Sequence, residues 1–270
     1  MSAVDELFRR LRSEGRKALM PFVTAGDPDL AFTAEALKAM SAAGAQICEL
    51  GIPYSDPIAD GPVIQASYTR ALEKKVKLAD IFAMAEKTVP SLAGPVVTMV
   101  SYAIIHRHGP AKYVAAAKQA GIAGAIVPDL LVEESAEFAK LCREQDFSLI
   151  QLITPTTPRE RAKWIAAQTT GFIYYVSVTG ITGERTQLPP ELIENVSWLR
   201  TQTELPICIG FGISAPEHVK LLAPVADGLI VGSALVRRLA AAETGSREAT
   251  LADASAYIRE LAAAFPKAGR

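Results

Sequence analysis

An acidic residue interrupts one of the most apolar segments of this sequence, and two more acidic residues follow it closely. Glu49 lies in the run Gln46–Leu50, and Asp56 and Asp60 come soon after. Alternate side chains of a β-strand share a face, so Glu49 is expected on the same face as Ile47. A carboxyl group buried among apolar side chains has a perturbed pKa, although a buried salt bridge is the alternative and loop Asp residues often only cap turns. The pattern therefore predicts acid–base chemistry centred on Glu49.

Two glycine-rich segments in the last quarter of the chain suit the binding of a phosphate group. Gly210–Ser214 and Val231–Ala234 each follow an apolar run. Glycine lets the backbone approach a ligand closely, and the free N–H groups at a helix start attract anions. A single Gly-Ser pair before a helix is more often an ordinary N-cap than a binding site, but two glycine-rich segments placed in this way favour a phosphate-binding site. A third segment, Ser177–Thr186, is long enough to close over a ligand, although its composition equally suits a simple connection.

Other common kinds of active site find little support. No lysine falls at the end of an expected strand, so a Schiff-base enzyme lacks its nucleophile, and no Ser/His/Asp or Cys/His arrangement is evident. His106 and His108 could mimic part of a metal site, but exposed loop histidines are the more ordinary interpretation, and His218 is expected far from the site. These observations leave carboxylate chemistry on a phosphorylated substrate, without a metal or a cofactor in this chain.

Short apolar runs alternate with helical patterns along the whole chain. The strands and helices that they predict must position Glu49, Asp60 and the glycine-rich segments. The expected strands are Leu19–Thr24, Gln46–Leu50, Val96–Ser101, Gly124–Val127, Ser148–Ile153, Phe172–Ser177, Pro206–Gly210 and Gly228–Val231. Nearly continuous apolar runs are typical of parallel strands covered on both faces. Eight such units in about 250 residues predict a (β/α)₈ TIM barrel, whose catalytic groups lie at the carboxyl ends of the strands. An open doubly wound sheet is the second choice, but the dinucleotide fingerprint is missing.

The rest of the chain adds an N-terminal helix and no second domain. An amphipathic segment, Val4–Arg12, precedes the first expected strand, and no linker or change of composition divides the sequence. We therefore predict a single TIM-barrel domain over residues 1–270, with the additional helix in residues 1–15 and the barrel in residues 16–265.

Composition excludes several classes of protein. The chain has 270 residues, 28 Lys and Arg, 29 Asp and Glu, and a formal charge of −1, which argues against a nucleic-acid-binding protein. No apolar stretch approaches the length of about 20 residues that spans a bilayer, and no signal sequence is evident. The odd number of cysteines, three, suits a reducing compartment. A cytoplasmic protein is therefore expected.

Several motifs together resemble one enzyme family. The motifs, in the family's order and spacing, are Pro21–Pro28, Glu49–Pro62, Val127–Leu130, Tyr174–Gly183, Gly210–Ile213 and Val231–Ala234. They resemble the family of the tryptophan synthase α subunit over about residues 20–235, and the second motif is highly specific. The resemblance implies a lyase of tryptophan biosynthesis that cleaves indole-3-glycerol phosphate to indole and glyceraldehyde 3-phosphate.

The resemblance also implies roles for individual residues. Glu49 matches the acid–base residue of the family, and Asp60 matches the carboxylate that accepts the indole N–H. Pro53, Asp56 and Pro57 fall in the loop that faces the partner subunit. The positions that match the walls and phosphate contacts of the substrate pocket are Phe22, Tyr174, Thr182, Gly183, Phe211, Gly212, Gly232 and Ser233.

The family works with a partner subunit, and this sequence departs from the family pattern at two places, of which the first lies near the partner-facing side in the family. The resemblance implies an α₂β₂ heterotetramer with a β subunit that carries pyridoxal phosphate, whereas this chain needs no cofactor. The segment Tyr102–Gly109 lacks the usual Asn, and Leu131 stands where Pro is common. Three alternatives remain open: a lyase that needs no partner, another phosphate-binding barrel such as an isomerase, and a non-catalytic subunit that binds ligand.

Overall fold

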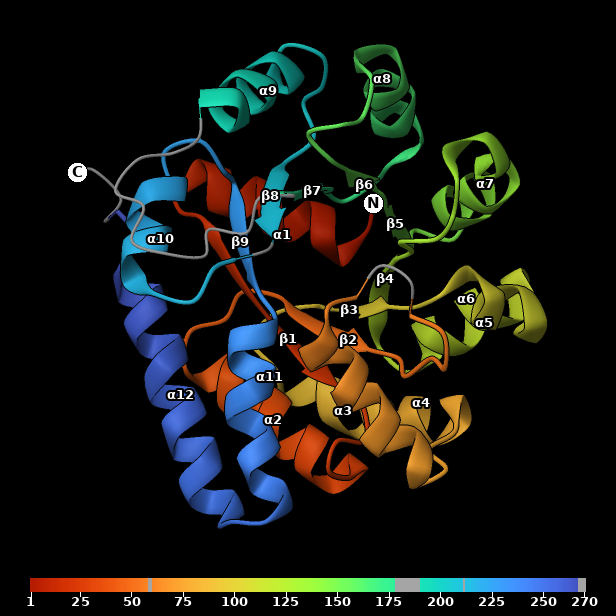
Figure 1. Ribbon diagram of the computed structural model, residues 1–270. Coiled ribbons are helices and arrows are strands. Elements are labelled where there is room, and N and C mark those ends of the chain that lie inside the picture. The colour runs from red at the N-terminus through yellow and green to blue at the C-terminus, as the bar shows by residue number, and fades with distance from the viewer. Residues whose placement is uncertain (58–59, 178–189, 211, 267–270) are drawn as a thin grey trace.

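Parallel strands at the centre of the molecule form a nearly closed barrel (Figure 1). The computed structural model describes residues 1–57, 60–177, 190–210 and 212–266. The strands of this part are β1 (Ala18–Thr24), β2 (Cys48–Gly51), β3 (Val96–Met99), β4 (Ile122–Ile126), β5 (Ser148–Ile150), β6 (Leu152–Ile153), β7 (Ile173–Val176), β8 (Ile207–Gly210) and β9 (Gly228–Val231). Their order is β5-β4-β3-β2-β1-β9-β8-β7-β6. Only Gln151 separates β5 from β6, so the two ends of the sheet meet within one segment. The predicted TIM barrel is confirmed, with the expected strand Ser148–Ile153 interrupted once.

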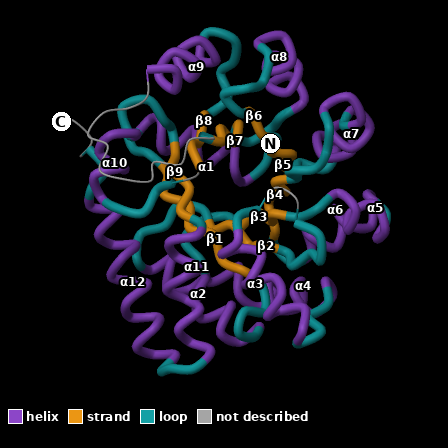
Figure 2. The backbone as a smooth tube through the Cα atoms, in the orientation of Figure 1, coloured by secondary structure: helices purple, strands orange, loops and turns teal. Residues whose placement is uncertain are grey.

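Helices surround the strands (Figure 2). They are α1 (Ala3–Ser13), α2 (Leu30–Ala42), α3 (Pro62–Glu73), α4 (Leu78–Thr88), α5 (Tyr102–His108), α6 (Pro110–Gln119), α7 (Ala136–Glu144), α8 (Arg159–Gln168), α9 (Pro190–Arg200), α10 (Pro216–Leu222), α11 (Ser233–Leu239) and α12 (Arg247–Ala263). Short 3₁₀ turns occupy η1 (Val89–Ser91), η2 (Val132–Glu134) and η3 (Ala240–Glu243). Two successive helices, α3 and α4, follow β2, where a single crossover helix would suffice. Within the described ranges, no helix combines the length and apolar character needed to cross a membrane.

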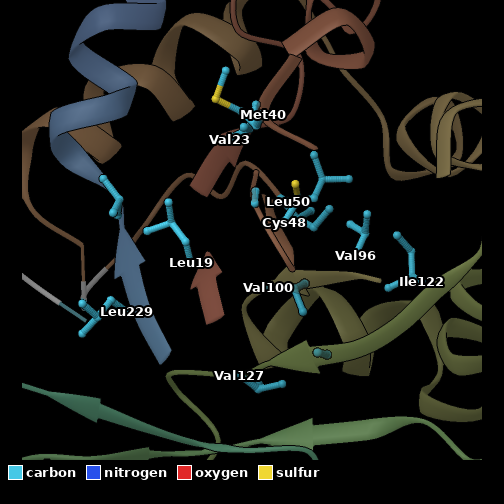
Figure 3. Close-up of a cluster of buried hydrophobic side chains, with 14 of the residues drawn as sticks. Leu19, Val23, Met40, Cys48, Leu50, Val96, Val100, Ile122, Val127 and Leu229 are labelled. Atoms are coloured by element: carbon cyan, nitrogen blue, oxygen red, sulfur yellow. The ribbon is translucent and has the colours of Figure 1, made fainter. Parts of the chain in front are cut away.

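The two faces of each strand enter different apolar clusters, as the period of two requires. Cys48 and Leu50 point outward and pack with Met40 of α2 between the strands and the helices (Figure 3). Ile47, the neighbour of Cys48, lies instead in a second cluster with Met20 and other side chains of the barrel interior. Glu49 therefore points into the barrel, on the face of Ile47 that the period of two predicts.

The expected N-terminal helix, α1, closes one end of this interior. Its buried residues, Val4, Leu7, Phe8 and Leu11, belong to the same cluster as the inward-facing strand residues. The ring centroids of Phe8 and Phe172 lie 5.7 Å apart. Asp5 completes a capping box with Ser2 and also accepts a hydrogen bond from the Gly171 N–H at 3.1 Å. These contacts attach α1 firmly to the barrel, at the end where the strands begin.

Candidate active site

A cavity of ≈ 240 Å³ opens at the other end of the barrel, where the strands finish. Side chains and backbone from most of the barrel line it: Phe22, Glu49, Asp60, Gly61, Ile64, Met99, Tyr174, Gly212, Ile213, Ser214, His218, Ile230, Gly232, Ser233, Ala234 and Arg237. Of the predicted site residues, the cavity brings together the two carboxyl groups predicted to be catalytic, two aromatic side chains and the glycine–serine segment. Thr182, Gly183 and Phe211 lie outside the described residues.

Glu49 is the most unusual group of the cavity. It sits in β2, opposite Phe22 of β1 and Val97 of β3, and its side chain is completely buried. Neither carboxylate oxygen has a hydrogen-bond partner among the described residues, so the described part of the chain offers no salt bridge there. Burial raises the pKa of Glu49 to about 8, because the charged form loses its hydration. At neutral pH the group is mainly protonated and can donate a proton.

Asp60 faces the same cavity from the loop between β2 and α3. The Gln65 side chain donates a hydrogen bond to the Asp60 carbonyl oxygen at 2.7 Å, which ties the loop to the first turns of α3. Partial burial raises the pKa of Asp60 only to about 6. The two carboxyl groups of one cavity therefore differ in charge at pH 7, and such a difference separates the roles of acid and anion.

Phe22 and Tyr174 form aromatic walls, and glycines make room for them. A β-carbon on Gly51 would overlap the Phe22 ring, and one on Gly210 would overlap the Tyr174 ring and hydroxyl. Burial raises the pKa of Tyr174 well above its usual value, and the charges of Glu49 and Asp60 raise it further. Tyr174 therefore stays protonated beside the carboxylates.

The glycine and serine residues assigned to phosphate lie together at one side of the cavity. Gly212 has a φ of +78°, a conformation that favours glycine. Gly232 precedes α11, and its carbonyl accepts hydrogen bonds from the amides of Leu235 and Val236 at 2.9 and 3.1 Å. The amides that begin a helix have no acceptor within it, so this segment suits an anion.

The predicted partner loop lines a separate, smaller hollow beside the cavity. Asp56 and Pro57 border it together with Tyr68 and Asp129, whereas Pro53 of the same loop is buried and is not among the lining residues. The Asp129 carboxylate accepts hydrogen bonds from the Ser101 hydroxyl at 2.6 Å and the Tyr102 amide at 2.7 Å. The loops after β2, β3 and β4 therefore form one continuous surface.

The histidines differ from the sequence interpretation. His218 was expected far from the site, but it lines the cavity, because α10 begins so soon after β8 that its first turn reaches the cavity wall. His106 and His108 are exposed as expected, yet they lie in the last turn of α5 and not in a loop. The described residues contain no group of three potential metal ligands. Sequence reasoning also missed Arg237, which carries a helical spacing of four from Ser233 as its only signal.

Comparisons with known proteins agree with this geometry. A family model described as "Tryptophan synthase alpha chain" matches residues 8–266. A tryptophan synthase alpha chain of Rhodopirellula baltica is 60% identical over 243 residues, which cover 89% of this chain and 87% of that protein. The Arabidopsis thaliana alpha chain is 42% identical over 97% of this chain and 95% of its own length.

Solved structures give the same result. The crystal structure of tryptophan synthase subunit alpha from Legionella pneumophila has a TM-score of 0.88 and 33% identity, with 98% of each chain covered. A structure of tryptophan synthase from Mycobacterium tuberculosis has a TM-score of 0.86 and 28% identity, covering 98% of this chain and all of that one. The resemblance inferred from the motifs is confirmed, and the chain belongs to the tryptophan synthase alpha chain family, a family of lyases.

Proposed function

We propose that this chain cleaves indole-3-glycerol phosphate to indole and glyceraldehyde 3-phosphate, as an alpha subunit of tryptophan biosynthesis. The observation that carries the proposal is the pairing of a buried, protonated Glu49 with a more acidic Asp60 in one cavity. A retro-aldol cleavage needs one group that can give and take protons and another that stays anionic.

Glu49 supplies both proton transfers. Its carboxyl group first donates a proton to C3 of the indole ring, which leaves a positive charge on the ring nitrogen. The resulting carboxylate then removes the proton of the adjacent glycerol hydroxyl. The O–H electrons form the aldehyde C=O, the C–C bond breaks, and its electrons return to the ring as neutral indole. A pKa of about 8 suits a group that must serve as acid and base near neutral pH.

Asp60 stabilises the cationic intermediate. With a pKa of about 6 it is mainly ionised at neutral pH, so it can accept the ring N–H and offset the developing charge. Phe22 and Tyr174 would flank the ring, and Phe211 would add a further wall. The phosphate would bind to Gly212, Gly232 and Ser233, with Gly183 and Thr182 contributing from the segment after β7.

A partner subunit completes the proposal. Membership of an alpha-chain family implies a β subunit, and we assign its contact to the loop of Pro53, Asp56 and Pro57. We further propose an α₂β₂ heterotetramer in the cytoplasm, with pyridoxal phosphate held by the β subunit and with residues 1–270 of this chain forming one domain.

Indole release tests the proposed reaction directly. The purified chain is incubated with indole-3-glycerol phosphate, alone and with a tryptophan synthase β subunit, and indole is measured. We expect slow release alone and faster release with β. Asp60→Asn should lower the turnover about 100-fold in both conditions, since the neutral amide cannot offset the ring charge.

The matched control is Asp56→Asn, which changes an exposed carboxylate of the same loop. It should keep the turnover of the isolated chain and reduce only the response to the β subunit. Absence of indole in every condition would reject the lyase assignment, and full activity without any response to β would favour an enzyme that acts alone.

A further inference from the structure

Two side chains in the cavity wall have no part in the mechanism above. Arg237 extends from α11 and His218 from α10, and both line the cavity beside Gly212 and Ser233. Residues four apart in a helix share one face, so Arg237 lies on the same face of α11 as Ser233. The side proposed to hold the phosphate therefore carries a guanidinium and an imidazole in addition to backbone amides.

Arg237 differs from its neighbour Arg238. Arg238 forms an ion pair with Asp253 at 2.9 Å and lies over the Tyr257 ring, 4.3 Å from its centroid. Arg237 is exposed and has no hydrogen bond or ion pair to any residue in the described ranges. Two adjacent arginines on one short helix thus have different environments, and only the one that faces the cavity lacks an anionic partner.

His218 is oriented by the backbone. The Ser214 amide donates a hydrogen bond to Nδ1 of His218 at 3.2 Å. With Nδ1 acting as acceptor, the proton of the neutral imidazole is on Nε2. This ring therefore presents an N–H donor at a fixed orientation in the cavity wall.

The charges of the cavity also favour an anion near Arg237. Glu49 and Asp60 are its acidic lining residues, and Arg237 is the only lysine or arginine among the described residues that line it. A phosphate dianion would add negative charge to a cavity that already contains the Asp60 carboxylate. Charge-assisted hydrogen bonds from a guanidinium can take two phosphate oxygens at once.

We propose that Arg237 and His218 bind the phosphate group of the substrate, Arg237 through its charge and His218 through its Nε2–H. The inference rests on the proposed function and adds side-chain ligands to the backbone contacts assigned there. It concerns binding of the phosphate end and not the proton transfers of Glu49.

Arg237→Gln and Arg238→Gln form a matched pair for the test. Steady-state kinetics with indole-3-glycerol phosphate should show KM raised about tenfold by Arg237→Gln, with kcat within about twofold of the wild type, because hydrogen bonds to charged groups are lost at the phosphate only. Titration calorimetry with glycerol 3-phosphate should show an affinity weakened by about the same factor. Arg238→Gln should leave KM and the glycerol 3-phosphate affinity unchanged. His218→Ala should raise KM by about threefold, and the double variant by more than either single variant.

The readouts separate this inference from the proposed function. Phosphate-free indole glycerol, used as a competitive ligand, should bind equally to the wild type and to Arg237→Gln. If Arg237 had only a structural role, the substitution would weaken the binding of this ligand too. Equal KM and equal glycerol 3-phosphate affinity in the wild type and Arg237→Gln would overturn the inference even if indole is released normally. Weakened glycerol 3-phosphate binding in a protein that releases no indole would uphold the phosphate ligands and reject the lyase assignment.

Discussion

The two ends of the barrel interior are built on opposite principles. At the end where the strands begin, α1 seats Val4, Leu7 and Phe8 among inward-facing strand residues, and polar contacts are completed by capping and hydrogen bonds. At the end where the strands finish, the interior opens into a cavity, and Glu49 is buried without a partner among the described residues. The segment that begins at Ile47 and continues into β2 connects these environments, with Ile47 in the apolar cluster and Glu49 in the cavity.

This difference means that residues at the closed end mainly contribute to stability, whereas residues at the open end contribute to the proposed chemistry. Apolar packing at the closed end stabilises the fold, whereas burying a carboxyl group without partners costs free energy. The cost at the open end is what raises the pKa of Glu49 into a useful range. Substitutions at the two ends should therefore change different measured quantities, and three experiments test that separation.

The largest effect is expected at the open end. Glu49→Gln should lower the indole release rate by about 1000-fold, because an amide can neither donate nor accept the required proton. Glycerol 3-phosphate should still bind, as calorimetry can show. Glu204→Gln, the same chemical change at an exposed site near the closed end, should leave the rate unchanged. Substantial turnover by Glu49→Gln would move the acid–base role to another residue.

Truncation at the closed end should affect stability instead. Phe8→Ala removes a ring that packs on Phe172, so the free energy of unfolding in urea should fall by about 3 kcal/mol while KM stays unchanged. Phe22→Ala is the counterpart at the open end. Its ring borders an existing cavity, so it should lose less stability and raise KM more. Equal changes in KM for the two variants would contradict the separation.

The smallest effect concerns the pH dependence of unfolding. The pKa of Glu49 is about 8 in the folded protein against an ordinary value of 4.5, so between these values the folded state binds more protons than the unfolded state. Stability should therefore fall as pH rises through this window, by about 1 kcal/mol from pH 6 to pH 7 for this group. Glu49→Gln should remove that part of the slope in urea titrations. Identical slopes in both proteins would show that Glu49 does not have a raised pKa.

Much of the fold and part of the site followed from local patterns. The period of two placed Glu49 on the face of Ile47, which the structure shows to be the inner one, and the glycine segments after the last strands line the cavity where we propose that phosphate binds. His218 could not be placed in this way, because its position depends on how soon α10 starts and how it packs. The only sequence signal of Arg237, its spacing of four from Ser233, is weak, because an arginine beside another arginine on a helix is ordinarily solvated. Only the tertiary structure distinguishes Arg237 from Arg238.

Local patterns were also insufficient to predict where some strands end. Apolar runs gave the strands, but the expected third strand, Val96–Ser101, ends at Met99 because Ser101 caps α5 with its side chain. The interruption at Gln151 also has no local signal. It falls between β5 and β6, the two strands at the ends of the sheet order, so it marks the place where the ring closes.

Closure of the ring has a consequence for synthesis of the chain. β1 pairs with β9, with Ala18 opposite Gly228. During synthesis β1 is therefore made long before β9, the strand that pairs with one of its edges. Until residues 228–231 emerge from the ribosome, one side of β1 is an unpaired strand edge, the feature that promotes association between incomplete chains. A ribosome that stalls before β9 would therefore release a polypeptide in which one edge of β1 is free to pair with another chain. Synthesis of β9 thus determines whether the barrel closes or β1 pairs with a neighbouring chain.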